Sequence, residues 1–62
     1  MTDNIAIAEG YTREVYGFAD GCDLCLLVKP NTFLDGRFKA WDTDGQRWVK
    51  VNGWLFSFED CE

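Results

Sequence analysis

The chain contains no histidine, the side chain that most often performs general acid–base catalysis near neutral pH. It also lacks a nucleophile with a plausible base beside it and a glycine-rich loop that could hold a phosphate. A chain of 62 residues leaves little room for a substrate cleft beside its core. These absences predict a protein that is not an enzyme and that binds no small-molecule substrate.

Long apolar runs are missing as well. The longest extends from Leu24 to Val28, whereas a membrane-spanning helix needs about twenty apolar residues. Near the N-terminus, Asp3 and Glu9 stand where a signal peptide would carry positive charge and then an apolar stretch. We therefore expect no contact with a membrane and a cytoplasmic location.

Cysteine is scarce, and its number, three, is odd. That number fits a reducing compartment better than a secreted disulfide scaffold. Cys22 and Cys25 are spaced as a CxxC pair, but only Cys61 and a nearby carboxylate could complete the four ligands of a structural zinc site. If residues 22–28 form a strand, side chains three positions apart point to opposite faces. The cysteines are expected to pack as small apolar side chains, and neither a metal nor a cofactor is predicted.

Negative charge is present in excess. Eleven Asp and Glu stand against six Lys and Arg, a net charge of −5, and both ends of the chain are acidic while the middle is mildly basic. Hydrophobic residues make up 47% of the chain and aromatic residues 16%, which is too apolar for a disordered acidic tail. We therefore expect a single folded domain, residues 1–62, that binds a basic partner.

A β-hairpin is expected in the middle of the chain. Polar and apolar residues alternate on both sides of Asp44-Gly45, a dipeptide that suits the positive φ angles of a type I′ turn. Residues 42–45 resemble the start of a calcium-binding loop, but the later ligands are missing. The expected pairs are Asp42 with Arg47, Trp41 with Trp48, Ala40 with Val49, Lys39 with Lys50 and Phe38 with Val51. One face of this hairpin is then apolar, and the other carries both tryptophans and two lysines.

After this hairpin, Asn52-Gly53 predicts a second tight turn that leads into a strand over residues 54–59. The last three strands would then pair in sequence as a meander. Residues 30–36 are expected to be a loop.

The first half of the chain is less regular. Residues 23–28 are apolar on both faces, as in a central strand. Residues 4–8 are expected to form a short strand with Ile5 and Ile7 inward. Residues 11–18 fit a strand that precedes a turn at Asp20-Gly21, or a helix with one apolar face.

The predicted fold is mainly β: a small curled antiparallel sheet or half-barrel of four or five strands, with the three-strand meander at its C-terminal end. A sheet of this size has to curl or be covered to hide its apolar side. The alternative is an α+β fold with one short helix at about residues 11–18.

Two sets of surface residues are candidates for binding. The first would imitate nucleic-acid phosphates and occupy a basic groove of a partner, and it comprises Asp20, Asp23, Asp42, Asp44, Glu59, Asp60 and Glu62. The second, an alternative platform for single-stranded nucleic acid, comprises Arg37, Lys39, Trp41, Trp48 and Lys50. Nucleic-acid binding depends mainly on positive charge that neutralises phosphates, so the net charge of −5 favours the first set over the second.

Residues 34–42 (LDGRFKAWD) and 51–55 (VNGWL) resemble small acidic proteins of bacteriophages and mobile elements, among which are anti-CRISPR inhibitors. The resemblance covers residues 34–59, and the matching residues are mostly structural. It implies a phage-encoded inhibitor in the bacterial cytoplasm that blocks the DNA-binding surface of a host CRISPR–Cas complex by DNA mimicry.

Overall fold

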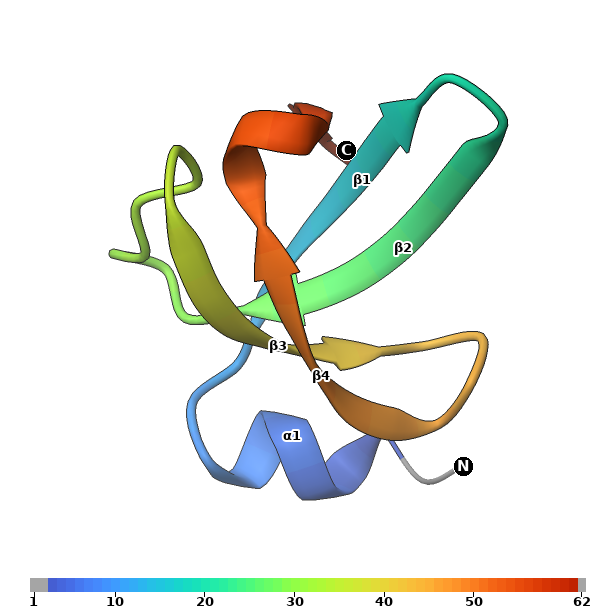
Figure 1. The fold of residues 1–62 in the computed structure, drawn as a ribbon. Coiled ribbons are helices and arrows are strands. Elements are labelled where there is room, and N and C mark those ends of the chain that lie inside the picture. The colour runs from blue at the N-terminus through green and yellow to red at the C-terminus, as the bar shows by residue number, and fades with distance from the viewer. Residues whose placement is uncertain (1–2, 62) are drawn as a thin grey trace.

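Five segments with the alternation or apolar character of strands form one antiparallel sheet in the computed structural model, which describes residues 3–61 (Figure 1). The elements are α1 (Asn4–Ala8), β1 (Arg13–Ala19), β2 (Cys22–Val28), β3 (Arg37–Asp42), β4 (Arg47–Asn52), the 3-10 helix η1 (Gly53–Leu55) and β5 (Ser57–Asp60). The mainly β prediction is confirmed, and most of residues 11–18 belongs to the strand Arg13–Ala19 rather than to a helix. No helix within residues 3–61 is long and apolar enough to cross a membrane.

The strand order is β4-β3-β2-β1-β5, so the predicted C-terminal meander is wrong. Asn52 ends β4, and its side-chain Oδ1 accepts a hydrogen bond from the backbone N–H of Trp54 at 3.1 Å. This contact starts η1, which turns the chain away from β4. β5 then pairs with β1, with Tyr16 opposite Glu59 and Gly17 opposite Phe58.

The hairpin of β3 and β4 has the predicted register, from Phe38 opposite Val51 to Asp42 opposite Arg47. Its turn differs from the expected type I′, because the positive φ angle, 54°, lies at Gln46. The Asp42 carboxylate accepts the N–H groups of Asp44 and Gly45, both at 3.1 Å, and so holds a longer loop.

The inner face of the curled sheet holds the main core. Its buried side chains come from four strands and are Val15, Leu26, Val28, Ala40 and Val51. Phe38 of β3 and Phe58 of β5 meet across this face, with ring centroids 5.6 Å apart, although their strands are not neighbours. The contact shows how strongly the sheet curls, as expected for a half-barrel.

The segment predicted as an N-terminal strand is the short helix α1. Its backbone bonds are local, beginning with the N–H of Ile7 and the carbonyl of Asp3. Ala6 is the buried residue, whereas Ile5 and Ile7 are 52% and 48% exposed rather than inward. The helix lies below β3 and β4 in Figure 1 and covers the outer face there.

Candidate functional site

The outer face of β2, β1 and β5 carries carboxylates around two aromatic rings. In β1, Val15 and Gly17 point to the core, so Glu14, Tyr16 and Phe18 point outward. The register places Tyr16 opposite Glu59 of β5, and Phe18 opposite Asp23 of β2. We call this surface the acidic face, and it consists of Glu14, Tyr16, Phe18, Asp23 and Glu59.

The two rings at the centre of the acidic face are stacked. Tyr16 and Phe18 have centroids 5.9 Å apart and planes 30° apart, and Phe18 is 39% exposed. Partial burial raises the pKa of the Tyr16 hydroxyl, and its hydrogen bond to Asp23 and the charge of Glu59 act in the same direction. Tyr16 therefore offers an apolar ring with a neutral hydroxyl near the Asp23 carboxylate.

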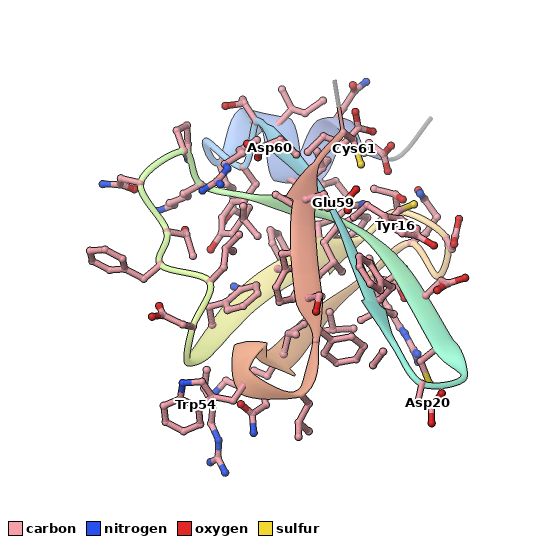
Figure 2. All side chains as sticks on the ribbon, turned by 90° about the horizontal axis from the view of Figure 1, so that it is seen from above. Tyr16, Asp20, Trp54, Glu59, Asp60 and Cys61 are labelled. Atoms are coloured by element: carbon pink, nitrogen blue, oxygen red, sulfur yellow. The ribbon has the colours of Figure 1, made fainter. Side chains whose placement is uncertain are left out.

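The acidic face contains no cation. Glu14, Asp23 and Glu59 are exposed, and within residues 3–61 none of them forms an ion pair. Figure 2 shows Tyr16, Glu59 and Cys61 near one another, which agrees with the register. The acidic face therefore carries three exposed negative charges and no compensating positive charge of its own.

The sheet brings only some of the predicted acids together. Asp23 and Glu59 belong to the acidic face. Asp20 is exposed at the tip of the β1–β2 hairpin, well away from Tyr16 in Figure 2. Asp44 is exposed in the loop after β3, whose Thr43 donates its backbone N–H to the carbonyl of Cys25.

Two predicted acids have structural roles instead. Asp60 accepts a hydrogen bond from Arg13 Nε at 3.0 Å, and this ion pair ties β5 to β1. Asp42 is only 8% exposed, holds the β3–β4 loop, and has Arg47 Nε 3.9 Å from its Oδ2. Glu62 lies outside the described residues.

The predicted tryptophan platform is covered rather than open. Trp41 is 4% exposed, and its Nε1 donates to Asp3 Oδ1 at 2.9 Å. Trp48 is packed edge-on between Trp41 and Tyr11, with centroids 5.0 and 4.9 Å away, and Lys39 Nζ lies 4.3 Å from its centroid. Because α1 and Tyr11 close over this pair, Trp41 has no free face for a base.

All three cysteines are free thiols, with Cys22 exposed and Cys25 and Cys61 partly buried. Cys25 lies on the outer face beside Tyr16, and Cys22 is three residues away at the start of the same strand. Burial raises the pKa of the Cys25 and Cys61 thiols, and nearby carboxylates add to the effect. Among residues 3–61 no three His, Cys, Asp or Glu side chains are grouped to hold a metal ion.

No protein-family model matches the chain, and neither a curated protein nor a solved structure is similar to it. The resemblance of residues 34–59 to phage proteins therefore stays a prediction. Those residues form β3, β4, η1 and part of β5. They contribute Glu59 to the acidic face, while Glu14, Tyr16, Phe18 and Asp23 lie outside them.

Sequence reasoning missed Glu14, Tyr16 and Phe18. The sequence does not show which strand pairs with β1. The alternation of residues 13–19 indicates which side chains share a face, but not which strand lies beside them. One signal was available, because Gly17 among larger residues indicates close approach of another chain segment. A Cβ at Gly17 would lie 2.5 Å from Cε1 of Phe58, which is the ring that β5 brings there.

Proposed function

We propose that this protein is a non-enzymatic interaction protein whose acidic face binds a basic, nucleic-acid-binding surface of another protein. The observation that carries the proposal is the set of three exposed carboxylates, Glu14, Asp23 and Glu59, around two aromatic rings with no cation among them. A surface of one sign steers association with a surface of the opposite sign and disfavours other partners.

The carboxylates are spread over three neighbouring strands, and a surface that imitates DNA has to present several negative charges in this way. Adjacent strands lie roughly 4.8 Å apart, and outward residues two positions apart along a strand are roughly 6.8 Å apart. Asp23 and Glu59 are separated by β1 and offset by two residues along it, so their backbones are roughly 12 Å apart. A groove lined with Lys and Arg to neutralise phosphates would meet three negative charges on this surface.

The aromatic centre supports a protein rather than a small ion as the partner. Aromatic residues are enriched in the buried cores of protein interfaces, where neighbouring contacts exclude water. Phe18 and the ring of Tyr16 would supply the apolar contact, while Glu14, Asp23 and Glu59 surround it.

In its most specific form, the proposal is that the partner is a host CRISPR–Cas complex and that the protein is a phage-encoded inhibitor in the bacterial cytoplasm. The support for this form is the resemblance of residues 34–59. Catalysis has no part in the proposal, because the chain lacks histidine and the raised pKa values of Cys25 and Cys61 keep these thiols protonated and weakly nucleophilic.

The test is competition with DNA for purified CRISPR–Cas effector complexes. The wild-type protein should displace labelled DNA, and Glu14→Gln/Asp23→Asn/Glu59→Gln should do so roughly 100-fold less well, because truncating charge contacts at an interface commonly costs several kcal/mol. The matched control, Glu9→Gln/Asp20→Asn/Asp35→Asn, removes the same charge from exposed positions outside the acidic face. Equal loss in both triple variants, or no displacement by the wild type, would contradict the proposal.

A further inference from the structure

A second charged surface lies on the outer face of β3 and β4 and has the opposite sign. Lys39 stands directly opposite Lys50, and Arg37 stands opposite Asn52 on the same face. Within residues 3–61 none of the three cations has a carboxylate at ion-pair distance. We call Arg37, Lys39 and Lys50 the basic ladder. Like charges directly opposite each other destabilise a sheet, so an anionic ligand would reduce the repulsion between these cations.

The surface around the basic ladder is hollowed. One shallow cavity of about 220 Å³ is lined by Arg37, Phe38, Lys39 and Lys50. A second, of about 230 Å³, is lined by Arg37, Lys50, Val51 and Asn52. The two cavities share Arg37 and Lys50, so both lie beside these cations.

An exposed tryptophan stands at the end of the basic ladder. The Asn52 side chain, on the same face as Arg37 and Lys50, accepts the N–H of Trp54, and the N–H of Gly53 bonds to the carbonyl of Gly36 at 2.7 Å. These bonds hold η1 next to Arg37, while the Trp54 side chain remains 74% exposed. Figure 2 shows Trp54 on the opposite side of the molecule from Tyr16 and Glu59.

We propose that the basic ladder and Trp54 form a binding site for single-stranded nucleic acid. Arg37, Lys39 and Lys50 would neutralise successive phosphates, and a base would stack on the free face of Trp54. Unpaired cations beside an open aromatic ring favour this ligand over an acidic protein segment, which has no base to stack. The site uses other strands than the acidic face and does not depend on the function proposed for that face.

The net charge of −5 does not prevent such binding at moderate salt. At about 0.1 M salt the Debye length is roughly 10 Å. The molecule is 22 Å across in its two shorter directions, so carboxylates on the far side are largely screened from a ligand at the basic ladder. The affinity for the ligand should therefore depend on the cations at the site, such as Lys50, more than on the net charge of the protein.

The experiment is a titration of the full chain with single-stranded homopolymeric DNA of roughly 10 nucleotides, followed by tryptophan fluorescence and by anisotropy of a labelled strand. Saturable quenching is expected and should be largely lost in Trp54→Phe, because Trp54 is 74% exposed whereas Trp41 is buried and Trp48 is partly buried. Trp54→Ala should weaken binding roughly tenfold. Lys50→Gln should weaken binding and lower the salt slope by about 0.7, the value for one phosphate contact on a single strand.

The matched control is Lys29→Gln, which removes one exposed positive charge outside the basic ladder and should leave the salt slope unchanged. Circular dichroism checks that each variant is folded. Absence of saturable quenching by DNA, or an equal loss in Lys29→Gln and Lys50→Gln, overturns the proposal. So does sedimentation that shows Lys50→Gln dissociating an oligomer, because a second copy would then occupy the ladder. The acidic-face triple variant should still bind DNA, so the two proposals fail separately.

Discussion

Gly17 of β1 makes room for the aromatic ring that closes the curl of the sheet. A Cβ there would lie 2.5 Å from the Phe58 ring, closer than real contacts allow. We expect Gly17→Ala to lower the free energy of unfolding by about 1–3 kcal/mol, the usual cost of overpacking, as measured by urea denaturation.

The control for this change is Gly36→Ala, where a Cβ would meet nothing within 4 Å and the φ angle is not positive. It should alter the free energy of unfolding by less than about 1 kcal/mol. In a Phe58→Leu background, Gly17→Ala should cost less, because the two residues are in contact. An unchanged cost in that background would show that the Phe58 ring is not the obstacle.

Asp3 connects the N-terminus to the β3–β4 loop through its carboxylate. The hydrogen bond from Trp41 Nε1 and then that from Gln46 Nε2 lower the pKa of Asp3 from its ordinary value of 3.8. A carboxyl group with a lowered folded-state pKa contributes stability above its unfolded pKa, and that contribution is lost as the pH falls through the folded value.

Asp3→Asn should therefore lower the urea midpoint at pH 7, and the difference from the wild type should shrink as the pH falls below about 4. Trp fluorescence follows the transition, since Trp41 is the principal donor to Asp3. Asp35→Asn serves as the control, because this exposed side chain forms no hydrogen bond or ion pair among the described residues. A difference for Asp3→Asn that stays constant between pH 7 and pH 2 would contradict the assigned role.

At the scale of elements, α1 decides whether the two inner tryptophans are covered. Ala6 is fully buried against Trp41 and Tyr11, whereas Ala8 of the same helix is exposed. Ala6→Leu should lower the free energy of unfolding by about 1–3 kcal/mol and shift tryptophan emission to the red, because the larger side chain pushes α1 outward. Ala8→Leu is the matched control and should change neither property. Identical spectra for the two variants would show that α1 does not depend on this contact.

Some strand pairings could be predicted from the sequence alone and others could not. The β3–β4 hairpin was predictable because its register depends on alternation within residues 37–51. The pairing of β5 with β1 was not, because residues 54–59 read as a strand whichever neighbour they have, and the choice depends on a contact between Gly17 and Phe58 far apart in the chain.

The same limit applies to the candidate site. Asp23 and Glu59 could be identified as acidic residues from composition and position, but their grouping with Glu14 and Tyr16 follows from the crossing of β5. The burial of Trp41 could not be predicted from the sequence, because α1 lies thirty or more residues earlier in the chain and packs against Trp41 only in three dimensions.

At the scale of the whole molecule, charge is separated between two parts of the outer face of one sheet. The acidic face lies on β2, β1 and β5, and the basic ladder lies on β3 and β4. The net charge of −5 and the unpaired carboxylates imply that the folded state carries self-repulsion that a bound partner would relieve. Neutralising these carboxylates should therefore raise the stability of the folded state and weaken the binding of the partner.

Added salt should raise the stability of the wild-type protein, because screening weakens repulsion among Glu14, Asp23 and Glu59. Between about 0.05 and 0.5 M NaCl the urea midpoint should increase. Glu14→Gln/Asp23→Asn/Glu59→Gln should be more stable than the wild type at low salt and should respond less to added salt. Glu9→Gln/Asp20→Asn/Asp35→Asn changes the net charge equally but removes scattered exposed acids, so its salt response should stay closer to that of the wild type. If both triple variants gained the same stability, the repulsion would arise from the total charge rather than from the acidic face. The clustering of carboxylates on which partner binding depends would then have no measurable effect on stability.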